Sequence, residues 1–240
     1  MVAARCPLLA AALPWIAHPP IRARGTIGGS LAHADPAAEL PAVAVALGAT
    51  LIATRSGQIQ ASGGSTAAVS TRAVSAAQFY QGYLTTALAP EELLTEIRFP
   101  AAAAHTGAAF VEVARRRGDF ALVGCAAQVT LAGGLIADAR IARAGPACAH
   151  SDALLARAAA DVAAGLSPPT DLHGSGEYRR HLAAVLIRRT VIQAHQRARD
   201  QCAREQRARD QRAREQRARD QRARDQRARD QRARDQRARE

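Results

Sequence analysis

The sequence predicts an α+β fold in two domains, followed by a repetitive charged tail. Residues 1–103 alternate between helical and extended hydrophobic patterns. Residues 104–195 begin with consecutive extended patterns and end in helical ones. Separate runs of strands and helices are typical of α+β architecture. Residues 196–240 consist of nine pentads, QRARD or QRARE and once QCARE, so we expect a solvated charged helix or a disordered segment there.

Two helices are predicted in the first domain. The first covers residues 8–17 and ends before Pro19-Pro20, because a proline pair interrupts a helix. The second covers residues 36–47, with Asp35 as its N-cap and Gly48 as its C-terminal stop.

Extended and polar segments make up the rest of the first domain. Residues 49–56 alternate between apolar and polar side chains, which indicates a strand, and the polar, glycine-rich residues 58–71 indicate a loop. Residues 76–88 carry aromatic side chains at nearly helical spacing, and residues 93–100 predict a strand closed by a proline. The alanine-rich residues 101–106 are a linker that contains the expected domain boundary.

Three consecutive strands are expected to open the second domain, and two helices to close it. The pair Gly133-Gly134 between the second and third strands indicates a hairpin turn. The expected strands cover residues 107–116, 120–131 and 135–145, and the expected helices cover residues 151–165 and 177–195.

Most of the positive charge belongs to the tail. The chain has a formal net charge of +12, and the 17 arginines and 9 acids of residues 196–240 account for +8 of it. The charge therefore says little about what the folded part binds. All 33 basic residues are arginine, so no lysine can form a Schiff base or bind a phosphate.

The cysteine spacing indicates whether the chain can bind a metal, and the N-terminal residues indicate whether the protein is exported. Cys6, Cys125, Cys148 and Cys202 are scattered and form no CxxC pair, so no metal site or iron–sulfur cluster is expected from this chain alone. Such thiols fit a reducing cytoplasm. Residues 1–17 resemble a signal peptide, but two prolines punctuate the short apolar run, so we expect an ordinary core helix in a cytoplasmic protein. No other stretch is apolar enough to span a membrane.

The stretch RGTIGGSLAHADPAAELP, residues 24–41, holds two adjacent glycines followed by acids. Paired glycines chiefly mark tight turns. Because they lack Cβ atoms, they also permit positive φ values and the close approach of a ligand, and successive N–H groups can form an anion-binding concavity. A structural turn and a phosphate cradle both remain open on these residues alone.

Four motifs, in order, resemble the FAD-binding medium subunit of the molybdenum hydroxylases, the family of carbon monoxide dehydrogenase and xanthine dehydrogenase. They are IAHPPIRARGTIGGSLAHADPAAELPA, FYQGYLTTALAPEELLTEIRFP, GAAFVEVARRRGDFALVGCAAQVTL and the helix around EYRRHLAAVLIRR. The resemblance covers residues 6–195. It implies a partial FAD-binding domain of the p-cresol methylhydroxylase type over residues 1–103. It also implies the family's small C-terminal domain, an antiparallel sheet plus helices, over residues 104–195.

The resemblance further implies which residues bind FAD. Glu39 falls where the family carries an acid, usually Asp, that hydrogen-bonds the polar chain of the flavin. Leu94 matches a position that packs on the cofactor, and a plain core leucine is an equal alternative. His33 and Asp35 are expected to be a surface turn residue and a helix cap rather than ligands. The loop that lies against the phosphates and the ribityl chain is Thr26, Ile27, Gly28, Gly29 and Ser30.

The chain also departs from the family's pattern. Family members begin with a further subdomain whose AGGxSL-type loop grips the other side of the diphosphate. Nothing here matches that loop, so we expect a truncated or mis-started member with weakened FAD retention. Related enzymes place a cofactor-facing lysine near Val111, where this chain has valine. The turn at residues 115–120 is either a locally paired charged turn or a segment that closes over the flavin edge.

The function implied by the resemblance is that of an oxidoreductase subunit. Electrons would pass from the iron–sulfur clusters of a small partner subunit through FAD to an acceptor, and a molybdopterin-binding large partner would oxidise the substrate. No side chain is expected to act as acid, base or nucleophile. The large partner would choose among carbon monoxide, purine, aldehyde and nicotine-type substrates.

The rival function is that of a non-catalytic interaction protein whose tail contacts nucleic acid or acidic partners. Arginine-rich repeats can bind RNA, but this tail lacks aromatic residues for stacking on bases. A nucleic-acid partner is therefore not expected.

Overall fold

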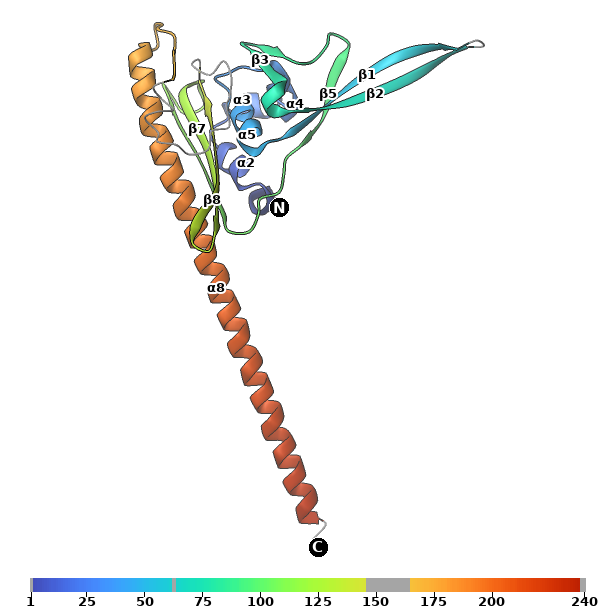
Figure 1. The fold of residues 1–240 in the computed structure, drawn as a ribbon, viewed down its shortest axis with the longest axis vertical. Helices are drawn as coiled ribbons and strands as arrows, with labels where there is room; N and C mark the ends of the chain where they lie inside the picture. The colour runs from blue at the N-terminus through green and yellow to red at the C-terminus, as the bar shows by residue number, and fades with distance from the viewer. Residues whose placement is uncertain (1, 62–63, 146–164, 238–240) are drawn as a thin grey trace. The chain divides into compact units, whose positions relative to one another are not determined.

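The computed structural model describes residues 2–61, 64–145 and 165–237. Residues Met1–Arg199 form one compact unit, here called the body, and Asp200–Glu240 form a second, the tail. The helices are α1 (Val2–Arg5), α2 (Pro7–Ala12), α3 (Pro19–Arg22), α4 (Ile27–His33), α5 (Glu39–Leu47), α6 (Ala76–Phe79) and α8 (Gly176–Arg237). The strands are β1 (Thr50–Ala61), β2 (Gly64–Ser75), β3 (Tyr80–Gly82), β4 (Thr85–Thr86), β5 (Glu92–Arg98), β6 (Thr106–Ala114), β7 (Ala121–Ala132) and β8 (Leu135–Ala144). The predicted α+β class is confirmed (Figure 1).

The N-terminal helices differ from the prediction. The apolar run forms α2, which ends at Ala12, and its Leu8 and Leu9 are buried in the core. The predicted helix does end before Pro19-Pro20, but this pair also begins the short helix α3, which was not predicted. The reason is that proline lacks an N–H group and has a helix-compatible φ, so it is well suited to the first helical turn.

Helix α5 is the central helix of the body. All nine of its residues are buried, and it packs against α2, α4 and the strands β7 and β8. Its predicted C-terminal stop is confirmed, since Gly48 adopts a left-handed conformation with φ 63°. The predicted N-cap is wrong: Ala38 holds that position, and the Asp35 carboxylate accepts a hydrogen bond from the Ala37 amide within the preceding turn.

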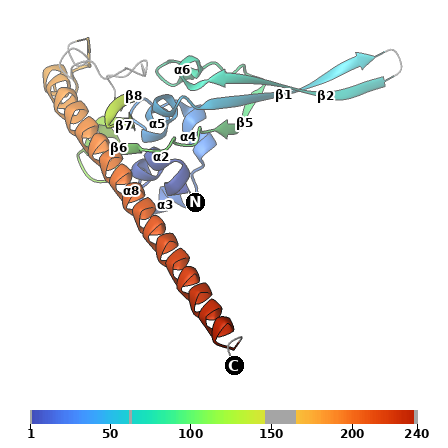
Figure 2. The same ribbon diagram turned by 60° about the horizontal axis from the view of Figure 1, so that its bottom comes forward.

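A long antiparallel hairpin replaces the loop predicted at residues 58–71. β1 and β2 pair from Thr50–Ser75 to Ala61–Gly64, and β5 adds to the other edge of β1. The outer half of this hairpin runs away from the helices of the body (Figures 1 and 2). The loop prediction failed because a low-hydrophobicity ribbon with little to bury lacks the apolar alternation used to recognise strands. The helical spacing seen at residues 76–88 yields only the short α6, followed by β3 and β4.

The second sheet is the predicted antiparallel one, in the order β6-β7-β8. Gly133 and Gly134 form its hairpin turn with φ values of 59° and 82°, the left-handed pair that a type I′ turn requires. One face of this sheet packs against α2 and α5, as Figure 1 shows. The shared core includes Leu8, Leu47 and Phe110.

The other face of this sheet meets the first part of α8. A Cβ atom on Gly107 would collide with the backbone of Ala194 and Ala198, so only glycine permits this close approach. The Arg197 guanidinium donates a 2.6 Å hydrogen bond to the Ala108 carbonyl. The sheet therefore lies between α2 and α5 on one side and the body portion of α8 on the other.

The predicted final helix is longer than expected, because α8 continues through the tail to Arg237. Of the two states expected for the tail, the structure has the helix. Its glutamines donate to acids four residues later, as from Gln206 to Asp210 at 3.0 Å and from Gln211 to Glu215 at 3.0 Å. Such i,i+4 bonds stabilise a helix that has no apolar face to bury. The helix predicted at residues 151–165 lies almost wholly outside the described residues.

Candidate functional site

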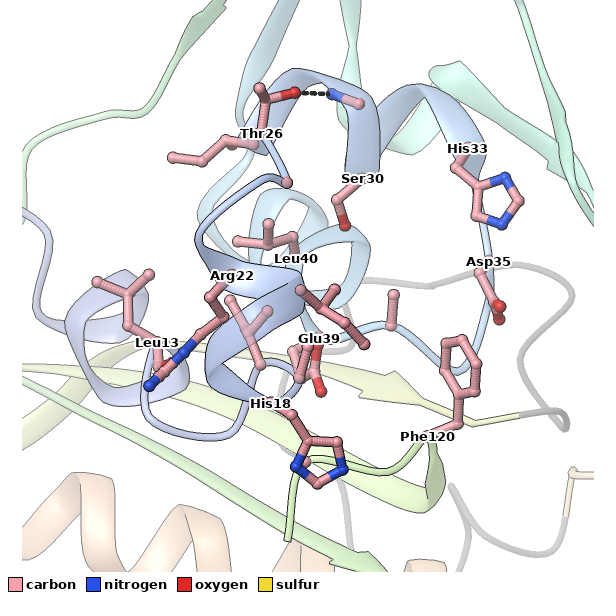
Figure 3. A pocket seen from close by; sticks show the side chains of 18 of the residues that line it. Leu13, His18, Arg22, Thr26, Ser30, His33, Asp35, Glu39, Leu40 and Phe120 are labelled. Carbon is pink, nitrogen blue, oxygen red and sulfur yellow. Dashed lines mark hydrogen bonds between the residues drawn. The ribbon is translucent and has the colours of Figure 1, made fainter.

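The body has a pocket of about 830 Å³ between α3, α4, the start of α5 and the turn before β7 (Figure 3). Its mouth carries apolar side chains, including Ile21, Ile27 and the largely exposed Phe120. Polar groups from several segments converge on the same space (Figure 3). A hollow of this size with mostly apolar walls and a few converging polar groups is typical of a small-molecule site.

The predicted phosphate loop forms the first turn of α4. Thr26 is the N-cap, and its hydroxyl accepts a 2.9 Å hydrogen bond from the Gly29 amide (Figure 3). The other leading N–H groups of a helix have no partner within the helix. Together with the helix dipole, such amides favour a negatively charged group.

The local conformation of the glycine pair differs from the expected one. Gly28 and Gly29 are helical, so the expected positive φ values do not occur here. Their small size still matters at Gly29, where a Cβ atom would come within 2.9 Å of the Thr26 hydroxyl oxygen. At Gly28 the nearest atom to such a Cβ is the Ile97 side chain at 3.9 Å, which is ordinary contact.

The structure brings five of the seven predicted site residues to the pocket wall: Thr26, Ile27, Gly29, Ser30 and Glu39. Gly28 lies between them in sequence without lining the pocket, and it faces β5. Leu94 is on β5 and packs against the hydrophobic core, and it does not line this pocket. Its role against the cofactor stays a prediction.

Glu39 is an unusually buried acid. It opens α5, and only 7 % of its surface is exposed. Burial, and then the nearby Asp35 carboxylate, raise the pKa of Glu39, although its own backbone amide opposes this by donating to it. Asp35 and His33, which were expected to stay outside the site, also line the pocket.

The two ends of the turn at residues 115–120 face different surroundings, one outside the pocket and one at its wall. Arg115 turns away and bonds the His173 ring at 3.3 Å, whereas Asp119 and Phe120 line the pocket. Gly118, with φ 92°, lets this turn pack closely against Ala17 and His18. A Cβ atom at position 118 would lie 2.9 Å from the His18 ring and 3.1 Å from the Ala17 backbone. His18 and Asp119 are themselves 3.3 Å apart.

Several pocket residues were missed by the sequence reasoning. His18 is a pocket residue that carried no sequence signal, because its partner Asp119 is 101 residues away. Arg22 and Arg24 also line the pocket. Their position just before the glycine pair was a usable signal, since cations beside an anion-binding turn reinforce it.

Strand β6 carries a buried acid, Glu112, close to its end. Side chains alternate along a strand, so Phe110 and Glu112 share the face that packs on α2 and α5, and Val111 points to the opposite face. Glu112 is 5 % exposed, and neither of its carboxyl oxygens has a hydrogen-bond partner. Burial, and then Glu39, raise the pKa of Glu112 to about 8.

Comparison with known proteins shows the family to which this chain belongs. The model of the FAD binding domain in molybdopterin dehydrogenase matches residues 1–102, and that of the CO dehydrogenase flavoprotein C-terminal domain matches residues 148–194. The nicotine 6-hydroxylase medium subunit of Paenarthrobacter nicotinovorans is 37 % identical, over 82 % of this chain and 70 % of that subunit. The carbon monoxide dehydrogenase medium chain of Hydrogenophaga pseudoflava is 33 % identical over the same shares.

The chain belongs to the FAD-binding medium subunits of the molybdenum hydroxylases. Solved structures agree with this membership of the family. A carbon monoxide dehydrogenase structure from Hydrogenophaga pseudoflava matches with a TM-score of 0.70 and 34 % identity, over 82 % of this chain and 69 % of that one. Quinoline 2-oxidoreductase from Pseudomonas putida 86 matches with a TM-score of 0.65 and 36 % identity, over 82 % and 70 % of the two chains. The sequence-based resemblance is thereby confirmed.

This medium subunit has a pocket that suits FAD. A helix N-terminus faces the space with Arg22 and Arg24 nearby, which suits the diphosphate, and the apolar walls suit a flavin or adenine ring. Among residues 2–61, 64–145 and 165–237, no group of three metal-ligating side chains occurs. No helix in the described ranges is long and apolar enough to cross a membrane.

Proposed function

We propose that the pocket beside α4 holds the diphosphate and ribityl part of FAD in this medium subunit. The observation that carries the proposal is that Thr26, Gly29, Ser30 and Glu39 come together in the wall of one pocket. Thr26, Gly29 and Ser30 belong to the start of α4 and Glu39 to the start of α5, so the packing of these two consecutive helices brings the groups together.

Each group has a definite task in this proposal. The leading amides of α4 donate to the diphosphate, and Thr26 fixes the turn that presents them. Arg22 and Arg24 add positive charge, and Glu39 accepts a hydrogen bond from a ribityl hydroxyl. Ile21, Ile27 and Phe120 exclude water. FAD supplies the redox chemistry, so the protein's task is to bind and orient it.

The oxidoreductase role of the family extends to partners. We infer that the small partner subunit carries iron–sulfur clusters, that the large one holds a molybdenum cofactor, and that the complex is cytoplasmic. The curated relatives named above are a nicotine 6-hydroxylase and a carbon monoxide dehydrogenase, whose substrates are unrelated. This fits a division of labour in which the large partner, rather than this chain, selects the substrate. Co-purification from the native host, followed by iron and molybdenum analysis, tests these partners.

Two serine variants test the pocket itself. Ser30→Asp puts a carboxylate in the first turn of α4, where it stabilises the helix but repels a diphosphate. We expect FAD affinity, measured by quenching of flavin fluorescence in the full chain, to fall at least tenfold.

The matched control is Ser175→Asp. Ser175 also begins a helix, where its hydroxyl accepts from the Tyr178 amide, and it does not line the pocket. Aspartate is an equally good cap, so FAD affinity should not change. Equal FAD affinity in Ser30→Asp and the unmodified chain would refute this placement of the diphosphate.

A further inference from the structure

Glu112 is a buried acid of β6, on the face of the sheet that packs against α2 and α5. The neighbouring residue across the sheet is Gly124, where a Cβ would lie 3.4 Å from the Phe110 ring and 3.8 Å from the Glu112 side chain. Both oxygens of the Glu112 carboxyl lack a hydrogen-bond partner, and only 5 % of the residue is exposed. An ionised carboxylate in such a position is costly unless it is paired.

No cation pairs with this acid. Within the part of the chain that the structure describes, neither Glu39 nor Glu112 makes an ion pair. The acid that influences Glu112 most is Glu39, which itself lines the pocket. The segment before α5 lies at the same end of the sheet as Glu112, because the Gly145 amide, next to Ala144 on β8, donates to the Pro36 carbonyl at 2.6 Å. Two carboxylates that interact in a buried environment repel each other, so one of the two carboxyls retains its proton to higher pH.

Other charged or titratable groups near Glu39 and Glu112 could also influence the pH dependence of the pocket. Asp35 influences Glu39, and the paired His18 and Asp119 lie at the pocket wall. Arg117 lies over the Trp15 ring, 5.4 Å from its centroid, and the buried Cys6 precedes α2. The groups on β7 and β8 that face Glu112, at Gly124 and Ala144, do not titrate. His33 completes the titratable groups of the pocket wall.

We propose that Glu112 is a positioning residue that keeps its proton while Glu39 is ionised, so that these two acids together carry a single negative charge when the pocket binds the anionic cofactor. The inference rests on the proposed FAD site. When this proton leaves Glu112 for solvent, a second carboxylate forms in the buried region that Glu39 influences. This adds repulsion toward the diphosphate through a medium of low dielectric constant. No electron moves and no bond other than the O–H bond breaks.

The proposal has a quantitative consequence for FAD binding. Above the pKa of Glu112 in the free chain, the free chain loses this proton and the FAD complex retains it. Binding of FAD then weakens by at most tenfold for each pH unit above that pKa. Burial and Glu39 place that pKa at about 8. FAD affinity of the full chain is therefore expected to be constant between pH 6.5 and 7.5 and about tenfold lower at pH 9.

The experiment measures FAD affinity of the full chain from pH 6.5 to 9 by quenching of flavin fluorescence. Glu112→Gln keeps the shape of the side chain but cannot ionise, so its affinity should not fall over this range. Glu112→Met serves as a second non-ionising variant should the glutamine protein not fold. Glu91→Gln changes an exposed glutamate outside the pocket and should follow the unmodified chain.

Two further measurements separate this effect from others. Imidazoles change charge between pH 5 and 8, so the comparison is repeated in a His18→Gln background, where the effect of Glu112→Gln on the pH profile must persist. Infrared difference spectra without FAD should show a protonated carboxylic acid at pH 6.5 that disappears by pH 9 and is missing in Glu112→Gln. This second readout does not depend on the cofactor.

The outcomes are distinguishable. Failure of the unmodified chain to bind FAD at pH 6.5 overturns the proposed function and this inference with it. FAD binding with parallel pH profiles in the unmodified chain and in both Glu112 variants overturns this inference alone. An infrared spectrum in which the acid is already ionised at pH 6.5 does the same.

Discussion

At the scale of single residues, buried polar side chains without full pairing distinguish this body from an ordinary hydrophobic core. Glu112 has no partner for its carboxyl oxygens. Arg179, by contrast, is 1 % exposed and strongly bonded: it grips both oxygens of Asp171 at 2.7 and 2.8 Å and donates to the Pro169 carbonyl at 2.6 Å. The Glu112 carboxyl is therefore costly to ionise, whereas the bonds of Arg179 connect the loop at residues 169–171 to α8.

Replacing Glu112 by glutamine should change the pH dependence of stability. The pKa of Glu112 is about 8 in the folded chain, against 4.5 for an ordinary glutamate. Between these values the unfolded chain binds fewer protons, so the free energy of unfolding falls as pH rises, by up to about 1.4 kcal/mol per unit. Urea unfolding at pH 5 and pH 8 should show this loss in the unmodified chain and a smaller one in Glu112→Gln. An equal loss in both would contradict it.

Replacing Arg179 by lysine should weaken the body. Lysine retains the charge but cannot bond both Asp171 oxygens and the Pro169 carbonyl from a planar group. We expect the free energy of unfolding to fall by about 1.5–3 kcal/mol, the range for hydrogen bonds to charged groups. Arg188→Lys, on the exposed side of the same helix, is the control and should leave urea unfolding nearly unchanged.

At the scale of elements, α4 is a seven-residue helix that depends on its cap. A helix this short is marginal in isolation, so side-chain capping and packing decide whether it forms. Thr26 caps its start, and β5 supports its flank through Ile97. Leu31 is fully buried in the core, so α4 depends on this cap together with its apolar packing against β5 and α5.

Removing the Thr26 hydroxyl should be measurable. Thr26→Val keeps the shape of the side chain but loses the acceptor for the Gly29 amide, which should cost about 1 kcal/mol of stability. Thr26→Ser retains the hydroxyl and should stay within a few tenths of the unmodified chain. Thermal unfolding of the three proteins distinguishes them, and equal stability of the valine and serine variants would show that the cap is dispensable.

At the scale of the whole molecule, the body is held together where the β6-β7-β8 sheet meets α8. The contact needs glycine at position 107, because its neighbours across the interface are backbone atoms of Ala194 and Ala198 rather than side chains that can turn aside. The tail is stabilised differently, by local bonds such as that from Gln206 to Asp210. Its helicity should therefore not depend on the body's core.

Gly107→Ala should destabilise the body without affecting the tail. Inserting a methyl group between packed backbones typically costs about 1–3 kcal/mol, so we expect a loss of that size in the body's unfolding transition. The helical signal that remains after the body unfolds should be the same in both proteins, as circular dichroism can check. Gly28→Ala, at an ordinary contact within a helix, is the control and should not destabilise.

Much of the fold follows from local chemistry that can be read along the chain. Gly48 and the Gly133-Gly134 turn were predicted correctly because a left-handed conformation is a local requirement of the backbone. The strands β6, β7 and β8 were found because their side chains alternate or run apolar over their full length. The first half of β1 was predicted from the alternation at residues 49–56, whereas the outer part of the β1–β2 hairpin was missed because backbone pairing, rather than an alternating apolar pattern, defines it.

The order of residues was sufficient for the family, the α+β class and one part of the pocket wall, since Thr26, Ile27, Gly29, Ser30 and Glu39 lie within one contiguous motif. Only the tertiary structure brought Asp119 to His18, across 101 positions, and packed the sheet face of Glu112 against α5, the helix that Glu39 opens. Local periodicity and turn chemistry act over a few residues, whereas the meeting of distant side chains depends on how helices and sheet pack together. The proton that we propose Glu112 keeps beside an ionised Glu39 depends on this packing of distant segments.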